Sequence, residues 1–145
     1  MPPVWTERNL WIQEFIPSDK SVIDWGCGDK DILRYISPLK YLGIDKSELA
    51  DIQADFNLHI PDIEERYQIG LVLGVLEYLD NPIAFLRSIK PTADQFLILC
   101  FVNHRLKPEW TNAFTSDEVS LMLNGLWKIV KFETHKNYLL GICSD

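Results

Sequence analysis

The chain has 145 residues, of which 47% are hydrophobic and 24% are charged, which is typical of one folded domain and excludes a disordered segment. Lys and Arg number 14 against 21 Asp and Glu, for a net charge of −7, so we expect no general attraction to nucleic acid or anionic membrane. The three cysteines have no metal-ligand spacing, and no signal peptide or apolar run of about 20 residues is evident, which together favour a cytoplasmic protein.

The first half of the chain alternates helical and strand-like segments. Residues 6–16 are predicted as a helix, because aromatic and aliphatic side chains recur at helical spacing before Pro17. Strands are predicted over residues 21–25, 40–45 and 51–55. A short helix is predicted after Gly28, with inward-facing Ile32, Leu33 and Ile36.

The second half begins with an apolar strand at residues 67–73, which suits a central position in a parallel sheet. Asn81 and Pro82 are predicted to be the N-cap and the first residue of a helix. The expected inward stripe of that helix is Pro82, Ile83, Leu86 and Ile89, and a strand over 95–102 follows.

A capping box over residues 115–118 precedes the last predicted helix. The inward residues of that helix are expected to be Val119, Met122, Leu123 and Leu126. Residues 127–134 and 138–143 are close enough to form an antiparallel hairpin at a sheet edge. This order predicts one doubly wound α/β domain over 1–145, with helices on both faces and residues 1–18 as a helical arm.

The segment Ile23-Asp24-Trp25-Gly26-Cys27-Gly28 carries the functional signal. Glycine permits a sharp strand-to-helix turn whose amides face a negative group, although a tight turn without a ligand would look the same. Asp45 ends the next strand, where an acid accepts from ribose hydroxyls or caps the following turn. Asp55, before Phe56, either accepts from an exocyclic amine or forms an Asx turn.

These segments, with Leu42-Gly43-Ile44-Asp45, Ala54-Asp55 and Val75-Leu76-Glu77-Tyr78-Leu79-Asp80-Asn81-Pro82, resemble the class I S-adenosylmethionine-dependent methyltransferases. The resemblance extends from about Ser21 to Cys143, and within the family it is greatest to small MetW-like and polysaccharide-cluster members. It implies a Rossmann-like, seven-stranded, mostly parallel sheet with S-adenosylmethionine as the cofactor.

The resemblance also implies a role for each matching residue. The methionine part of the cofactor would contact Asp24, Gly26, Cys27 and Gly28. Asp45 would hold the ribose, with the stem of Lys46 along the adenine and Asp55 and Phe56 also at the adenine. Leu73 and Gly74 would lie beneath the sulfonium, with Tyr78 nearby.

Lys30 stands where the family has its third glycine. We expect it in the first turn of the following helix, where it either reaches the methionine carboxylate or obstructs the site. Tyr78, Glu77 and His104 are the candidate proton acceptors for methyl transfer. His104 with Arg105 and Lys107 forms either a positive rim for an anionic acceptor or a solvated basic loop.

Tryptophans are numerous for this length. Trp5 and Trp11 either form a lid over the cofactor or pack the helix, and Trp25 is expected to pack over the first helix. Residues 108–113 are too few for a cap domain, so the acceptor site should be open or completed by a protein partner or a second copy.

Three hypotheses follow. The first is methyl transfer from S-adenosylmethionine to a small, anionic acceptor. The second is a non-catalytic binding or regulatory protein of the same fold. The third, a nicotinamide-dependent oxidoreductase, is disfavoured because Asp31 stands where that fingerprint needs glycine.

Overall fold

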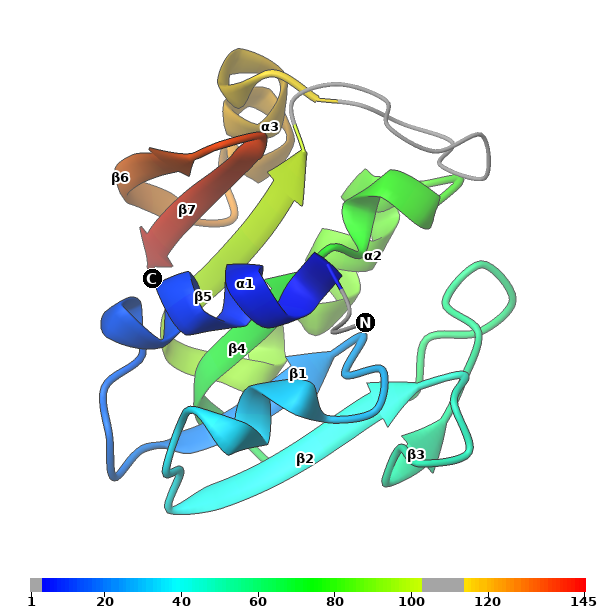
Figure 1. The fold of residues 1–145 in the computed structure, drawn as a ribbon. Coiled ribbons are helices and arrows are strands. Elements are labelled where there is room, and N and C mark those ends of the chain that lie inside the picture. Colours follow the sequence, from blue (N-terminus) through cyan, green and yellow to red (C-terminus); the bar gives the residue numbers. More distant parts are fainter. Residues whose placement is uncertain (1–3, 103–113) are drawn as a thin grey trace.

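The computed structural model describes residues 4–102 and 114–145 (Figure 1). The helices in these ranges are α1 (Val4–Ile12), α2 (Pro82–Ile89) and α3 (Ser116–Leu123). The 3-10 turns are η1 (Gln13–Phe15), η2 (Asp31–Arg34), η3 (Leu76–Tyr78) and η4 (Lys90–Thr92). The strands are β1 (Ser21–Trp25), β2 (Lys40–Asp45), β3 (Ile52–Gln53), β4 (Tyr67–Leu73), β5 (Ala93–Val102), β6 (Lys128–His135) and β7 (Tyr138–Ser144).

The strands form one sheet in the order β3-β2-β1-β4-β5-β7-β6. Strands β1 to β5 are parallel to one another, whereas β7 is antiparallel to both β5 and β6. The predicted mostly parallel sheet with a C-terminal antiparallel hairpin is therefore confirmed. That the whole chain is a single domain stays a prediction.

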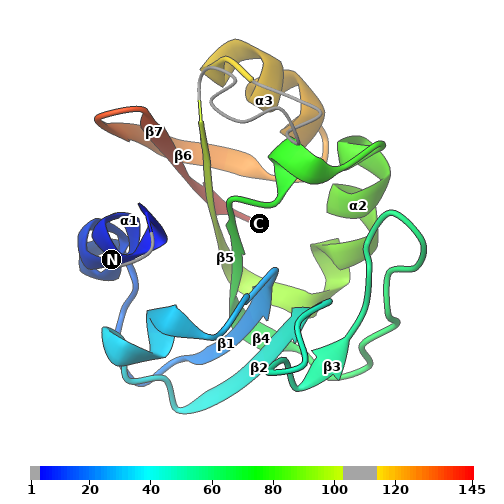
Figure 2. The same cartoon turned by 45° about the vertical axis from the view of Figure 1, so that its right-hand side comes forward.

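Helical elements cover both faces of the sheet, as Figure 2 shows with α1 on one side and α2 and α3 on the other. On the α1 side, Ile12 and Ile16 pack against Ile69, Leu71 and other buried side chains. The larger core on the other side includes Phe85, Leu86, Val119 and Leu123. These two buried layers pack against opposite faces of the sheet and hold its strands in position.

The predicted helix starts are confirmed. The Asn81 side chain accepts a hydrogen bond from the Ala84 N–H at 3.1 Å, and Pro82 is the first residue of α2. Thr115 and Glu118 form the reciprocal capping box of α3. Both caps satisfy N–H groups that a helix start otherwise leaves without partners.

Three local packing predictions are wrong. The segment after Gly28 forms only the turn η2, in which Ile32 is buried but Leu33 is exposed. In α2, Ile83 is exposed and Phe85 takes its expected place in the core. Trp25 packs on the α2 side, against Phe85, and not over α1.

Within the two described ranges, no helix combines the length and the apolar character that crossing a bilayer requires.

Candidate functional site

Two adjoining cavities lie at the carboxyl ends of β1, β2 and β4. The larger has a volume of about 580 Å³, and its walls include Asp45, Lys46, Asp55 and Phe56. The smaller has a volume of about 160 Å³, and its walls include Arg8, Asp24, Cys27, Gly28 and Leu73. Gly26, Gly74 and Tyr78 line both cavities, and we call these three residues the neck.

The glycine turn after β1 is tied closely to the neighbouring strands. The N–H groups of Gly26 and Cys27 both donate to the Ile44 carbonyl, at 2.7 and 3.1 Å. Gly26 has a φ of +93°, and a Cβ there would lie 2.2 Å from Cγ2 of Val75. Both the backbone conformation and the close approach of Val75 therefore require glycine at this position.

Asp45 holds the turn from the other side. Its Oδ2 accepts from the Gly28 N–H at 3.0 Å, and its Oδ1 accepts from the Ser47 N–H at 2.9 Å. A carboxylate has about four acceptor positions, so Asp45 can cap this turn and still accept from a ligand in the larger cavity. Both sequence alternatives for Asp45 are compatible with this geometry.

The wall formed by Asp55 and Phe56 is fixed by local bonds and by packing. Asp55 Oδ1 accepts from the Asn57 N–H at 3.0 Å, which is the predicted Asx turn. The Phe56 ring packs against Trp25 and Phe85, with centroid distances of 5.8 and 5.1 Å. The wall is therefore anchored in the core.

Asn57 is a site residue that the sequence analysis missed. Its amide donates to the Tyr78 carbonyl at 2.9 Å and accepts from the Asp80 N–H at 2.9 Å. These two bonds join the Asp55 wall to the neck. The only sequence signal was its place directly after Asp55 and Phe56.

Asp24 lies in the smaller cavity with 2% of its surface exposed. Its Oδ2 accepts from the Tyr41 hydroxyl at 2.7 Å, whereas its Oδ1 has no hydrogen-bond partner among the described residues. Burial raises the pKa of Asp24 to about 6, although the Tyr41 hydrogen bond and the Arg8 charge oppose this rise. A buried acceptor of this kind is costly unless a ligand supplies a donor.

Arg8, on α1, supplies a positive charge to the same cavity, and the sequence analysis missed it too. Its guanidinium bonds Asn9 Oδ1 at 3.2 and 3.1 Å, and Asn9 Nδ2 donates to Asp31 Oδ2 at 3.0 Å. A Cβ on Gly74 would lie 2.8 Å from Arg8 Nη1. Gly74 therefore leaves the space that the guanidinium occupies.

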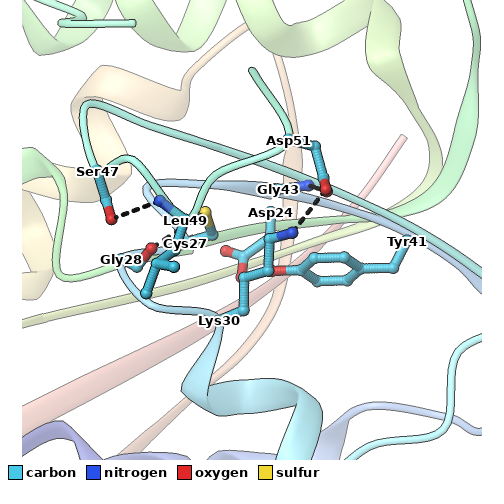
Figure 3. A network of polar contacts seen from close by, with 9 residues as sticks. All are labelled: Asp24, Cys27, Gly28, Lys30, Tyr41, Gly43, Ser47, Leu49 and Asp51. Atoms are coloured by element: carbon cyan, nitrogen blue, oxygen red, sulfur yellow. Dashed lines mark hydrogen bonds and ion pairs between the residues drawn. The ribbon is translucent and has the colours of Figure 1, made fainter. Parts of the chain in front are cut away.

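Lys30 does not lie in the predicted first turn of a helix. It precedes η2 with a φ of 64°, outside any helical turn. Its Nζ lies 2.6 Å from Asp51 Oδ1, and Asp51 Oδ2 accepts from the Gly43 N–H at 2.8 Å (Figure 3). The hydrogen bond from Lys30 lowers the pKa of Asp51, and Lys30 is not among the residues lining the two cavities described above.

The proton-acceptor candidates differ in position. Tyr78 is in the neck with 40% of its surface exposed. Glu77 is buried beside the cavities: its Oε2 accepts from the Val102 N–H at 3.3 Å, and burial raises its pKa to about 7. His104 lies outside the described residues, as do Arg105 and Lys107.

Trp11 lies on α1, away from the two cavities. Trp11 packs against Phe15 and stacks on His135, so it packs α1 rather than covering a cavity. The Trp5 side chain lies outside the described part of the chain. In that part, no cluster of His, Cys, Asp or Glu could hold a metal ion.

The sheet order and the position of the cavities define the fold of the class I S-adenosylmethionine-dependent methyltransferases. A solved S-adenosylmethionine-dependent methyltransferase from Aquifex aeolicus matches with a TM-score of 0.73 and 19% identity, over 96% of this chain and 88% of that one. No protein-family model and no curated protein matches the sequence.

Two further solved structures show what this fold accommodates. The 1,6-didemethyltoxoflavin-N1-methyltransferase of Burkholderia thailandensis, with 1,6-didemethyltoxoflavin and S-adenosylhomocysteine bound, matches at a TM-score of 0.72 and 14% identity, over 98% of this chain and 78% of that one. The [4+2]-cyclase SpnF matches at a TM-score of 0.77 and 11% identity, over 97% of this chain and 80% of that one. Identities this low show the fold alone, and the placement near MetW-like proteins stays a prediction.

Proposed function

We propose that this protein binds S-adenosylmethionine across the two cavities and transfers its methyl group to a small acceptor. The observation that carries the proposal is that Asp24 and Arg8, of opposite charge, line the smaller cavity, beside a larger cavity walled by Asp45 and Asp55. An α-amino acid presents an ammonium and a carboxylate, which are complementary to Asp24 and Arg8. A nucleoside presents hydroxyls and an exocyclic amine, which suit Asp45 and Asp55.

The chain's own residues have distinct tasks in this reaction. When bound, S-adenosylmethionine supplies an electrophilic methyl group. Asp24 and Arg8 would orient the amino-acid end of the cofactor, and Asp45 would hold the ribose. Gly26 and Gly74 make room at the neck for the Val75 side chain and the Arg8 guanidinium. Tyr78, also in the neck, is placed to contact the acceptor. A hydroxyl or amine acceptor would need a proton acceptor there, whereas a carboxylate would not.

Calorimetric titration with S-adenosylmethionine and with S-adenosylhomocysteine tests the proposal. Arg8→Met should weaken binding of both ligands by about 1.5–3 kcal/mol, the range for a hydrogen bond to a charged group. Arg66→Met is the matched control, because Arg66 is exposed beside Asp94 at the amino ends of β4 and β5, away from the two cavities. If the native protein binds neither ligand at millimolar concentration, the proposal is refuted.

A non-catalytic binding or regulatory protein is the second candidate. It is favoured by Lys30, which stands where the family has its third glycine, and by residues 108–113, which are too few for a cap domain over an acceptor. Incubation with S-adenosylmethionine and a panel of small anionic hydroxyl, amine and carboxylate acceptors separates the two candidates. Tight cofactor binding without any methylated product, together with a stable protein complex, would favour this second function.

A further inference from the structure

Strand register places one tyrosine diagonally across from the buried acid of the smaller cavity. Asp24 of β1 is paired with Gly43 of β2, and Tyr41 precedes Gly43 by two residues. Because side chains alternate along a strand, Tyr41 and Asp24 lie on the same face of the sheet. A long aromatic side chain can span such a diagonal pair.

Gly43 provides the space that this contact requires. A Cβ at Gly43 would lie 3.0 Å from Cε1 of Tyr41 and 2.9 Å from Sγ of Cys27. Without that Cβ, the Tyr41 ring extends over the strand toward β1, and its hydroxyl meets Asp24 (Figure 3). The sequence pattern behind the contact is a tyrosine two residues before a glycine, on the strand beside the acid.

The hydrogen bond divides the carboxylate of Asp24 into two different oxygens. Oδ2 is held by the Tyr41 hydroxyl at 2.7 Å. Oδ1 has no partner among the residues that the structure describes, and Asp24 lines the smaller cavity. A carboxylate fixed at one oxygen presents the other in a single orientation.

We propose that Tyr41 is a positioning residue: it holds Asp24 with Oδ1 directed toward the ammonium group of the bound cofactor. This rests on the proposed function, because the ammonium is that of S-adenosylmethionine or S-adenosylhomocysteine. Tyr41 does not line either cavity, so it acts only through Asp24.

The same bond favours the charged form of Asp24. Burial raises the pKa of Asp24, and the Tyr41 hydroxyl on β2 and the Arg8 guanidinium on α1 lower it. Asp45, at the end of β2, raises it. Cys27 in the glycine turn stays neutral, because burial raises its own pKa to about 12. Removing the Tyr41 hydroxyl should therefore shift the ionisation of Asp24 to higher pH.

The test is the pH dependence of S-adenosylhomocysteine binding by Tyr41→Phe and by the native protein, each between pH 5.5 and 8. The ratio of the two Kd values cancels the titration of the ligand itself. We expect this ratio to increase as the pH falls, by up to about tenfold for each unit by which the pKa of Asp24 rises. Tyr67→Phe is the matched control, since Tyr67 lies at the amino end of β4, whereas the cavities lie at the carboxyl ends of the strands. The ratio of its Kd to that of the native protein should stay near one.

A second variant displaces the ring but keeps its hydroxyl. Gly43→Ala should reproduce the pH-dependent part of this loss, because the added methyl group pushes the Tyr41 ring away from Asp24. The same methyl group also presses on Cys27 Sγ, which should add a loss that is equal at every pH. A Kd ratio that is the same at every pH in Tyr41→Phe would show a packing role only, and would overturn the inference. A native protein that does not bind the ligand would instead overturn the proposed function and, with it, the role of Tyr41.

Discussion

Replacing Asp24 by asparagine should stabilise the ligand-free protein while weakening its binding of cofactor. Asparagine has nearly the same shape as aspartate, and its carbonyl oxygen can still accept from the Tyr41 hydroxyl. What it removes is a negative charge that is 2% exposed and only partly hydrogen-bonded. Active-site groups often lower stability in this way, because their environment suits the bound state.

The magnitude follows from the pKa of Asp24, which burial raises from an ordinary 3.8 to about 6. A folded-state pKa above the unfolded value means that the native state holds the proton more tightly. This contribution to stability is fully present below pH 3.8 and is lost as the pH rises through 6. The loss is about 3 kcal/mol at neutral pH, and Asp24→Asn should recover about 1–3 kcal/mol of it, since the new amide needs an acceptor.

Urea unfolding at pH 7.5 and at pH 4 measures this directly. The gain in unfolding free energy should be clear at pH 7.5 and small at pH 4, where the native Asp24 is already protonated. Affinity for S-adenosylhomocysteine at pH 7.5 should fall by about 1.5–3 kcal/mol. Asp94 is an exposed acid at the amino end of β5, so Asp94→Asn should change neither the unfolding free energy nor the affinity. A loss of stability at pH 7.5, or an equal gain at both pH values, would refute the reasoning.

Two further substitutions test the turn itself. Asp45→Ala removes the acceptor of the Gly28 and Ser47 N–H groups, so calorimetry should show cofactor binding weaker by about 1.5–3 kcal/mol. Thermal unfolding should show a loss of stability of only about 1–2 kcal/mol, because those partly exposed N–H groups can bond to water instead. An unchanged affinity in the folded protein would limit Asp45 to capping. Lys30→Gly removes the left-handed strain at Lys30, about 1–2 kcal/mol, and its exposed ion pair with Asp51, about 1 kcal/mol or less, so stability should change little. Because Lys30 lines neither cavity, cofactor affinity should stay within about twofold. A clear loss of affinity would show that Lys30 reaches the cofactor, and a clear gain that it obstructs the site.

The sheet could be predicted from the sequence because its signals are local. The central strands β1, β4 and β5 contain short apolar runs, and the turns and caps between them use residue types with specific backbone preferences. The predictions at Leu33 and Ile83 were wrong because helical periodicity assumes a regular helix of some length. A single 3-10 turn, and an eight-residue helix beside a large aromatic at Phe85, do not bury the faces that periodicity assigns.

Residue types alone predicted the glycine turn and the acids at the strand ends, since these depend on backbone conformation and on the end of the sheet where all parallel strands finish. They could not determine the partners of those groups. Arg8 is brought to the site by the docking of α1, which the Asn9–Asp31 hydrogen bond ties to the turn η2, and Tyr41 is brought to Asp24 by the register of β1 against β2. Such contacts join segments far apart in the chain, and only the packed tertiary structure decides which of many side chains lie within hydrogen-bonding distance.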